Sequence, residues 1–414
     1  MNMEQQDKPV KATEKKISRR TLLGGALATA ILPVTSVFAK YIQVGVPAIP
    51  DPTKQPGPLP GKVGTRSPFE SPVKKPSDIS SRTPLQDLYS TITPSDLHFE
   101  RHHAGVPSID PNQYELLIHG MVERPMKFSL HDLKRFPSVT RTCFIECAGN
   151  FRTGKEDMTV QEILGLTSQS EWTGVMLSTL FRELGVDPKA TWFLAEGGDA
   201  AVLTRSIPIR KAWDDAMIVY AQNGEAIRPE QGYPARLLLP GWEGNTNVKW
   251  LRRIEISDAP YFTREETSKY TYPVKDKIRM FSFEMDARSI ITYPSFPQTI
   301  ERGWIEIRGI AWSGRGKVVK VEVSTNAGKN WNEARLQDPI LEKAHTYFRH
   351  LWHWDGSETE ILSRVTDETG YTQPTLKQLI DARGKDIGGY HMNPVTAWRV
   401  KRDGNVVFKP ENHK

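Results

Sequence analysis

Two cysteines, Cys143 and Cys147, are the only thiols in the sequence. The segment 141–147 has the apolar-rich pattern of a strand, and it ends at Ala148-Gly149-Asn150, where small residues let the backbone approach a bulky ligand. On one strand the two Cα atoms would lie ~13 Å apart at ~3.3 Å per residue, whereas a disulfide needs roughly 4.4–6.8 Å. We therefore expect two free thiols. Cys143 fits a core position, and Cys147 is either an inert buried thiol or a metal ligand.

Arg152 follows Cys147 closely in the sequence. A positive charge beside a thiol lowers its pKa toward the thiolate that metals bind. We therefore expect Arg152 to favour metal binding by Cys147.

The histidines form two groups, His98, His102 and His103 in one and His350 and His353 in the other. A zinc site needs about four tetrahedral ligands, and neither spacing is a recognisable set, so we expect no zinc. The sequence also lacks Cys-x-x-Cys-His, Gly-x-Ser-x-Gly and a Gly-rich Lys-Ser/Thr phosphate loop. We therefore expect no c-type haem in this chain and find no support for a hydrolase or an NTPase.

The segment Cys147-Ala148-Gly149-Asn150 resembles the molybdenum-ligand motif of the sulfite oxidase family, in which one cysteine thiolate binds a metal held by a pterin dithiolene. Upstream, residues 99–103 (Phe-Glu-Arg-His-His) resemble the family's Phe-x-Arg-Asn-His, with His102 in place of Asn. Four downstream segments follow in the family's order: Gly198-Asp199, Ser206-Ile207-Pro208, the block 232–241 (Gly-Tyr-Pro-Ala-Arg-Leu-Leu-Leu-Pro-Gly) and the block 244–250 (Gly-Asn-Thr-Asn-Val-Lys-Trp). The match extends over about residues 95 to 400, and as an ordered set it is more specific than any single piece.

This resemblance implies a molybdenum-molybdopterin cofactor whose metal is held by Cys147. The reaction it implies is oxygen-atom transfer, in which the cofactor carries the redox chemistry and the protein orients the substrate. Catalytic roles fall to Cys147, Arg101 and Arg152, the two arginines holding anionic sulfur–oxygen groups. The implied cofactor contacts are Phe99, Arg101, His102, His103, Cys147, Asp199, Arg236, Asn247, Val248 and Lys249.

Three positions depart from the family pattern. Leu203 stands where the family has a tyrosine, Gln231 where it has a histidine, and Phe151 where it has the first of two arginines. The loss of a tyrosine hydroxyl and an arginine weakens recognition of a small sulfite dianion. We therefore expect a different or larger sulfur substrate.

With these departures the chain resembles the sulfane dehydrogenase branch of the family (SoxC type). The resemblance rests on segments 144–147 (Phe-Ile-Glu-Cys), 203–208 (Leu-Thr-Arg-Ser-Ile-Pro) and 363–370 (Ser-Arg-Val-Thr-Asp-Glu-Thr-Gly). It implies a sulfur-carrier protein as substrate, a c-type cytochrome with two haems as electron acceptor, and a homodimer or heterotetramer.

Two other functions stay open. One is a sulfite:cytochrome c oxidoreductase, which would turn over free sulfite. The other is a binding or assembly module that keeps the fold without the enzyme activity, and such a module would purify without molybdenum.

Two structural regions must position these residues, and together they predict an α+β protein. Strands at 114–120 and 235–240 and short helices at 130–136 and 177–185 predict a mixed α/β molybdopterin-binding domain over 95–270. Strands at 304–309, 318–324 and 347–352 predict an all-β, immunoglobulin-like sandwich over 280–414. By resemblance the sandwich serves dimerisation, and we assign it no catalytic residue.

The N-terminal region carries an export signal. Paired arginines at Arg19 and Arg20 precede an apolar run over 22–32 and a small-residue cleavage pattern at Val37-Phe38-Ala39, as in a twin-arginine signal over 1–39; an ordinary secretion signal is the alternative. We therefore expect a bacterial periplasmic protein, exported folded with its cofactor. Residues 40–94 form a proline-rich arm, because nine prolines between 41 and 80 disfavour helix and inner strand.

The charge and apolar patterns bear on nucleic-acid binding and on a membrane span in the mature chain. The net charge is +6, and about half of it belongs to the signal. The mature chain is thus too weakly basic to indicate nucleic-acid binding. No mature segment reaches the ~18 apolar residues that a membrane span requires.

Overall fold

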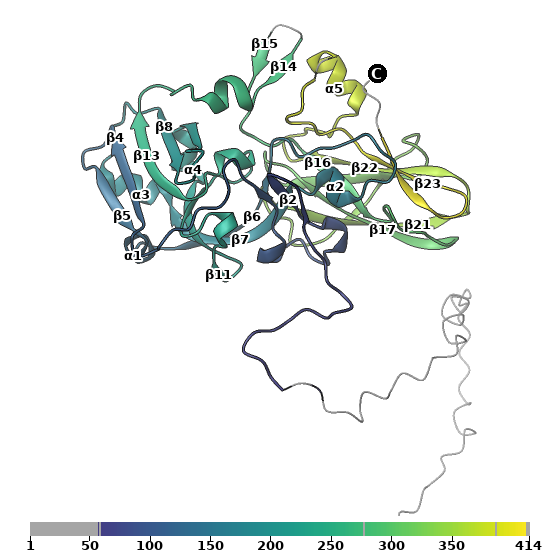
Figure 1. Cartoon of the computed structure of the whole chain (residues 1–414). Helices are drawn as coiled ribbons and strands as arrows, with labels where there is room; N and C mark the ends of the chain where they lie inside the picture. Colours follow the sequence, from purple (N-terminus) through teal and green to yellow (C-terminus); the bar gives the residue numbers. More distant parts are fainter. Residues whose placement is uncertain (1–56, 58, 276–277, 386, 411–414) are drawn as a thin grey trace, which may run out of the picture. The chain divides into compact units, whose positions relative to one another are not determined.

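The computed structural model describes residues 57, 59–275, 278–385 and 387–410 (Figure 1). Ser67–Lys414 forms one compact unit. Of the unit Met1–Arg66, residues 57 and 59–66 are described, and they are exposed. The predicted export signal over 1–39 and the first part of the predicted arm lie outside the described residues.

The first half of the compact unit holds two five-stranded sheets. One sheet is antiparallel and has the order β11 (Glu225–Ala226), β10 (Met217–Gln222), β7 (Thr167–Met176) and β6 (Val139–Glu146), with β12 (Arg236–Leu238) also paired to β10. The other has the order β5 (Met126–Ser129), β4 (Glu115–Gly120), β13 (Leu251–Ser257), β8 (Trp192–Gly197) and β9 (Thr204–Pro208). In this second sheet β4 and β13 run parallel and the other pairs run antiparallel, so the sheet is mixed.

Short helices flank these sheets, and local sequence explains where two of them begin and end. They are α1 (Leu130–Arg135), α2 (Val160–Leu164), α3 (Leu177–Leu184) and α4 (Arg210–Asp214). Helix α1 begins at a capping box in which Ser129 and Asp132 bond each other's backbone N–H groups. Helix α3 ends at Gly185, which adopts the left-handed conformation that glycine tolerates best. Both helices lie where the sequence predicts them.

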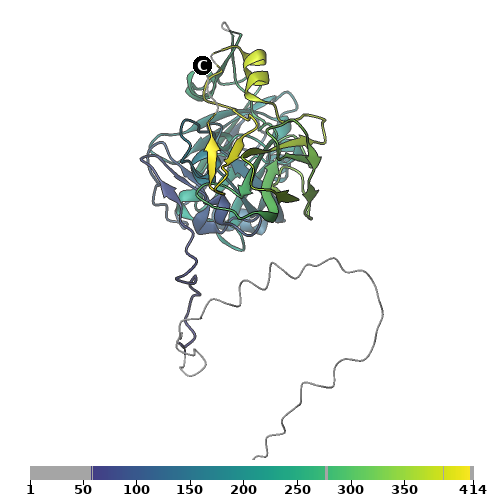
Figure 2. The same ribbon diagram turned by 90° about the vertical axis from the view of Figure 1, so that its right-hand side faces the viewer.

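The second half is a sandwich of two antiparallel sheets, which faces the viewer in Figure 2. The first sheet has the order β16 (Arg288–Tyr293), β17 (Gly303–Trp312), β21 (Thr346–Trp354) and β20 (Arg335–Leu336). The second has the order β19 (Asn332–Glu333), β18 (Val318–Ser324), β22 (Thr359–Asp367), β23 (Ala397–Val400) and β24 (Val406–Lys409). The two halves together confirm the predicted α+β class.

Smaller elements connect and cover the sheets. Helix α5 (Leu376–Arg383) lies beside the hairpin β14 (Tyr272–Val274) and β15 (Ile278–Met280) (Figure 1). The single-turn helices are η3 (Leu85–Asp87), η4 (Ser95–Leu97), η5 (Pro229–Gln231), η6 (Gly244–Thr246) and the π-helical η7 (Glu265–Lys269). Within the part of the chain that the structure describes, no helix is long and apolar enough to cross a membrane.

The strands before the first large sheet form a small sheet of their own. Strands β1 (Lys75–Pro76) and β3 (Glu100–Arg101) flank β2 (Ser80–Arg82), which is buried. The proline-rich region 40–94 thus contains a middle strand, β2, although its prolines disfavour an inner strand. Strand β3 brings Arg101 to the same part of the molecule as Arg82.

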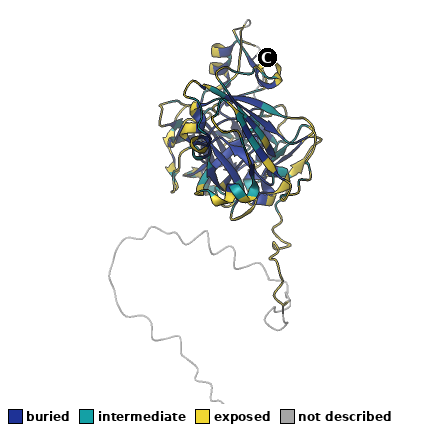
Figure 3. Ribbon diagram, turned by 90° about the vertical axis from the view of Figure 1, so that its left-hand side faces the viewer, coloured by how far each residue is buried: buried dark blue, intermediate teal, exposed yellow. Residues whose placement is uncertain are grey.

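The two halves share one hydrophobic core, so they meet through packed side chains rather than across a linker. Phe144 on β6 and Ile163 on α2 belong to the same buried cluster as the sandwich residues Trp312, Phe348 and Trp398. Figure 3 shows such buried residues in dark blue along the inner strands. Burial of this kind stabilises the fold by about 25 cal/mol per Å² of apolar surface, and here it also fixes the sandwich against the strand that leads to Cys147.

Candidate active site

Strand β6 carries Cys147 to the edge of a cavity. The strand ends at Glu146, and the turn that follows closes where the Asn150 N–H donates to the Cys147 carbonyl at 2.9 Å. The Cys147 N–H donates to the Leu166 carbonyl at 3.0 Å, which holds the turn against the sheet. Cys143 is buried and Cys147 is partly exposed, and both thiols are free, as predicted.

Glu146, next to the thiol, is fully buried and accepts hydrogen bonds from both halves of the molecule. Its Oε1 accepts from Arg288 Nη1 of β16 at 2.6 Å and from Asn150 Nδ2 at 2.9 Å. Its Oε2 accepts from Trp312 Nε1 of β17 at 2.7 Å. The sandwich therefore helps to hold the turn that presents Cys147.

The cavity encloses about 650 Å³ of space, including the part open to solvent. It brings together nine of the predicted site residues, which come from segments up to 150 residues apart in the sequence: Phe99, Arg101, His102, His103, Cys147, Asp199, Arg236, Asn247 and Lys249. We call this space the thiol cavity.

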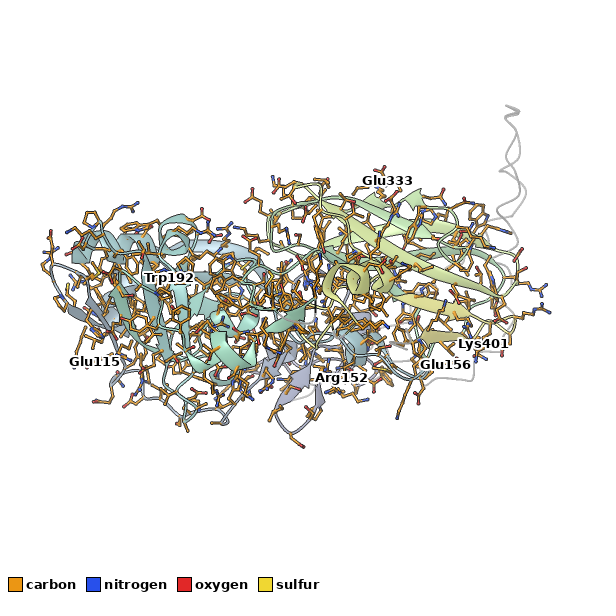
Figure 4. All side chains as sticks on the ribbon, turned by 90° about the horizontal axis from the view of Figure 1, so that it is seen from above. Glu115, Arg152, Glu156, Trp192, Glu333 and Lys401 are labelled. Atoms are coloured by element: carbon orange, nitrogen blue, oxygen red, sulfur yellow. The ribbon has the colours of Figure 1, made fainter. Side chains whose placement is uncertain are left out.

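The other two predicted residues lie elsewhere. Val248 is buried in the hydrophobic core between the two sheets of the first half. Arg152 is exposed and lines a second cavity together with Arg82. Figure 4 labels Arg152 beside the N-terminal strands.

Among the described residues, the thiol cavity is lined by three cations, Arg101, Arg236 and Lys249, and by one carboxylate, Asp199. Arg236 is 2% exposed and donates to the carbonyls of Gln231 at 2.8 Å and Asn247 at 2.9 Å, while its Nε has no partner among the described residues. Burial lowers the pKa of Arg236 to about 9. A buried cation without a carboxylate is costly, so an anionic ligand would stabilise it.

Lys249 is the second of these cations. Its Nζ donates to the carbonyls of Arg101 at 3.2 Å and Glu230 at 3.0 Å and lies 4.5 Å from the centre of the Trp250 ring. Burial, and then the charge of Arg236, lower the pKa of Lys249 well below its usual value. A cofactor phosphate or pterin oxygen at this position would offset both effects.

Burial and nearby charges act on the Cys147 thiol in opposite directions. Burial raises the pKa of the thiol, and the charges of Glu243 and Glu146 raise it further, whereas Arg101 lowers it. Arg101 is thus a cation that acts on the thiol, and the expected effect of Arg152 on it stays a prediction. A cation bound to the sulfur would stabilise the thiolate and so lower this pKa.

The three N-terminal histidines have separate surroundings. His98 is buried, and burial lowers its pKa to about 3. His102 Nε2 lies 2.9 Å from Glu100 Oε2, and its Nδ1 lies 2.8 Å from Lys249 Nζ. His103 Nε2 lies 3.0 Å from the Tyr270 hydroxyl, and burial lowers its pKa to about 4. A neutral His103 can thus exchange a hydrogen bond with a phenol that itself lines the thiol cavity.

Sequence reasoning missed several residues here. Tyr270 and Asn245 line the thiol cavity. From beyond α5, the Tyr390 ring would lie 3.6 Å from a Cβ placed on Gly149, and the His391 N–H donates to the Ala148 carbonyl at 2.9 Å. Asn245 belongs to the block 244–250, so the resemblance could have found it. Tyr270, Tyr390 and His391 lie more than 100 positions from Cys147 and in no recognisable motif, so only the fold could have found them.

The chain matches two domain families in succession. Residues 103–264 match the oxidoreductase molybdopterin binding domain, and residues 279–397 match the Mo-co oxidoreductase dimerisation domain. Among solved structures, the sulfane dehydrogenase SoxCD from Paracoccus pantotrophus is 40% identical, with a TM-score of 0.78 over 93% of this chain and 100% of that chain.

Two curated relatives show the breadth of the similarity. An NADH nitrate reductase of Solanum lycopersicum is 32% identical over 71% of this chain and 38% of its own length. The mitochondrial sulfite oxidase of Rattus norvegicus is 29% identical over 73% of this chain and 61% of its own length. The chain therefore spans about two fifths of that nitrate reductase and about three fifths of that sulfite oxidase. With its thiol, its three cations and both matched domains in family order, this chain belongs to the sulfite oxidase family of molybdopterin oxidoreductases.

Proposed function

We propose that this chain is a molybdenum-dependent dehydrogenase that oxidises a carrier-bound sulfane sulfur with oxygen from water and passes the electrons to a c-type cytochrome. The observation that carries the proposal is the thiol cavity, where Cys147 lies with three cations and one carboxylate. The similarity of this chain to a sulfane dehydrogenase, over the whole of that solved chain, supports the choice of substrate.

The residues of the thiol cavity fit molybdenum-molybdopterin. Cys147 would ligate the metal, Arg236 and Lys249 would bind the anionic and hydrogen-bonding groups of the pterin, and Asp199 would accept from its N–H groups. When bound, the cofactor supplies two-electron oxygen-atom transfer. The chain holds the cofactor, keeps Cys147 in place through the turn 147–150, and presents Arg101 to an anionic sulfur group.

The substrate side favours a sulfur group larger than free sulfite. Leu203 and Gln231, which stand where the family has a tyrosine and a histidine, both line the thiol cavity, and the Gln231 Nε2 donates to the Phe99 carbonyl at 2.8 Å. Arg152 lines a different cavity from Arg101, so the two arginines would not enclose one small dianion. A longer substrate attached to a carrier protein could contact both.

The cellular setting belongs to the same proposal. The twin-arginine signal supports export of the folded, cofactor-loaded chain to the periplasm. There a c-type cytochrome, with two haems as the resemblance implies, would accept the electrons. The matched dimerisation domain supports a homodimer, or a heterotetramer with the cytochrome.

A sulfite:cytochrome c oxidoreductase is the second candidate, favoured by the 29% identity with rat sulfite oxidase. The test compares cytochrome c reduction by the purified, metal-loaded protein with free sulfite and with a carrier protein that bears a persulfide, whose outer atom is the sulfane sulfur. Activity confined to the carrier supports the sulfane function, and strong activity on free sulfite replaces it with the second candidate. Nitrate-dependent oxidation of a reduced dye is the matched control for the nitrate reductase relatives, and we expect none.

A further inference from the structure

A segment of the second half of the chain, residues 387–392, lies against the turn that presents the thiol. The His391 N–H donates to the Ala148 carbonyl at 2.9 Å, and the Tyr390 ring would lie 3.6 Å from a Cβ placed on Gly149. His391 has a φ of 52°, in the left-handed region, where residues other than glycine stay only when their surroundings hold them. We call residues 387–392 the bridging segment, because it belongs to the second half and contacts the first.

Apolar contacts hold the bridging segment to the loop that follows the turn. Its buried residues Ile387 and Met392 cluster with Leu376 of α5, and Phe151 packs against this cluster. Phe151 is one of the departures from the family pattern and stands where the family has an arginine. An arginine at this position would bring a charged group to an apolar cluster, which is unfavourable unless the charge is paired. The departure therefore joins the loop after the turn to the second half instead of adding a cation.

Buried polar contacts hold the same segment. His391 is 1% exposed, and its Nε2 lies 3.3 Å from Glu243 Oε2. The other oxygen of the fully buried Glu243 accepts from Arg205 Nη1 at 2.8 Å, and Arg205 Nε pairs with Glu266 Oε1 at 2.5 Å. Burial raises the pKa of Glu243, but Arg205 and then His391 lower it by more, so Glu243 keeps its charge. A charged network thus runs from β9 through Glu243 to the bridging segment.

This network reaches the thiol cavity through its neighbours. The guanidinium carbon of Arg205 lies 5.5 Å from the centre of the Tyr270 ring, and Tyr270 lines the cavity. The rings of Tyr270 and Tyr390 are in tilted contact. Glu243 precedes Gly244, which also lines the cavity. Both tyrosines come from outside the segments that resemble the family's cofactor-binding motifs, so the side of the cavity that Tyr270 forms, with Tyr390 against it, is left for the substrate.

We propose that Glu243, His391 and Phe151 are positioning residues that hold the bridging segment and Tyr270 as the wall of the thiol cavity against which the substrate's sulfur group binds. The substrate class rests on the proposed function, whereas the positioning rests on the contacts above. None of the three is among the described residues that line the cavity, so their effect on the substrate passes through Tyr270, Tyr390 and the turn. The second half of the chain thereby takes part in selecting the substrate.

The test compares two substitutions of His391 in the purified, cofactor-loaded protein. His391→Leu removes the donor to Glu243, whereas His391→Gln can keep an N–H donor there. With the persulfide-bearing carrier as substrate, we expect His391→Leu to raise KM several-fold with little change in kcat, because substrate binding is weakened and the chemistry is not. His391→Gln should recover most of the wild-type KM. His353→Leu is the matched control, because His353 is exposed on β21, and its KM should equal that of the wild type.

Glu243→Met is a second variant that acts on the same network. It removes the carboxylate that His391 contacts but leaves Arg205 paired with Glu266, so no buried cation loses its last carboxylate. We expect the same rise in KM as in His391→Leu, with the cofactor retained.

Hydrogen–deuterium exchange follows the bridging segment without requiring sulfur oxidation. Its amides should exchange several-fold faster in His391→Leu and Glu243→Met than in the wild type, and His391→Gln should match the wild type. Equal exchange in all four proteins, or a KM that is unchanged in both His391→Leu and Glu243→Met, would overturn the proposal. Failure of the proposed function looks different, because then the wild type itself would not oxidise the persulfide, yet the order of the exchange rates would remain.

Discussion

Glu146 and Arg288 form a fully buried ion pair, with 2.6 Å between Oε1 and Nη1, that joins the residue before Cys147 to the first residue of β16. Arg288 also donates to the carbonyls of Asn150 and Met392. The pair thus connects the metal-ligand turn with the sandwich and with the loop that carries His391. It makes the sandwich part of the site's support rather than a separate assembly module.

Removing one member of this pair should destabilise the protein strongly. Glu146→Gln leaves the Arg288 charge buried without a carboxylate, which typically costs about 3–5 kcal/mol. Urea unfolding should show this loss, and the double variant Glu146→Gln/Arg288→Met should recover part of it. The exposed pair Glu115–Lys127 is the control, because Glu115→Gln should change stability by less than ~1 kcal/mol. A Glu146→Gln protein as stable as the wild type would contradict this account of the turn.

Arg236 should be needed to retain the cofactor. In the described part of the chain no carboxylate pairs with it, and its Nε is unpartnered, so much of its charge is available to an anionic group in the thiol cavity. We expect Arg236→Met to lower the molybdenum content several-fold, measured by inductively coupled plasma mass spectrometry. Far-ultraviolet circular dichroism should stay unchanged.

Arg124→Met is the matched control for this loss, because Arg124 has 61% of its side chain exposed and pairs with Glu183 at the surface. We expect its molybdenum content to equal that of the wild type. Equal losses in the two variants would mean that Arg236 has no specific part in holding the cofactor.

The burial of His345 should lower the free energy of unfolding as the pH falls. His345 is 3% exposed, its Nε2 lies 3.0 Å from the Thr167 hydroxyl, and burial lowers its pKa to about 3. The histidine pKa is about 6.5 in the unfolded chain. Between about pH 3 and pH 6.5 the unfolded chain therefore binds a proton at His345 and the folded chain does not. The contribution of His345 is complete above about pH 6.5 and is lost as the pH falls toward 3, by up to ~1.4 kcal/mol per pH unit.

The check is the free energy of unfolding measured from pH 7.5 to 4.5. His345→Gln should reduce the slope of the free energy of unfolding against pH by up to the ~1.4 kcal/mol per pH unit that one proton contributes. His353→Gln, on the exposed side of β21, should leave this slope unchanged. A slope that is equal in the wild type and in His345→Gln would rule out this titration.

Much of the fold and of the cofactor side could be predicted because each motif is local. Apolar alternation marked β4, β17 and β18, and the Ser129 cap and Gly185 bracket helices where the sequence places them. The residues around Cys147, Arg236 and Lys249 carry their family patterns within a few positions, so their meeting in one cavity follows from the resemblance.

The rest depends on contacts between distant segments. Arg82 is one of many basic residues in the sequence, and only the fold shows that it is buried beside Arg152. The rings of Tyr270 and Tyr390 are in tilted contact, with centres 5.3 Å apart, although 120 residues separate them. Conversely, Val248 lies within a cofactor-binding motif but packs in the core, while its neighbours Asn247 and Lys249 line the thiol cavity.

The most direct test of the central claim is the molybdenum and pterin content of the exported, wild-type protein compared with Cys147→Ser, which keeps the size of the side chain and removes the thiolate. We expect about one molybdenum per chain in the wild type, and in the variant a molybdenum content that falls steeply or a metal that no longer supports turnover, while the melting temperature stays close to that of the wild type. Absence of both metal and pterin from the wild-type protein, or equal metal content and equal sulfur-dependent cytochrome reduction in the two proteins, would contradict the assignment of Cys147 as the metal ligand.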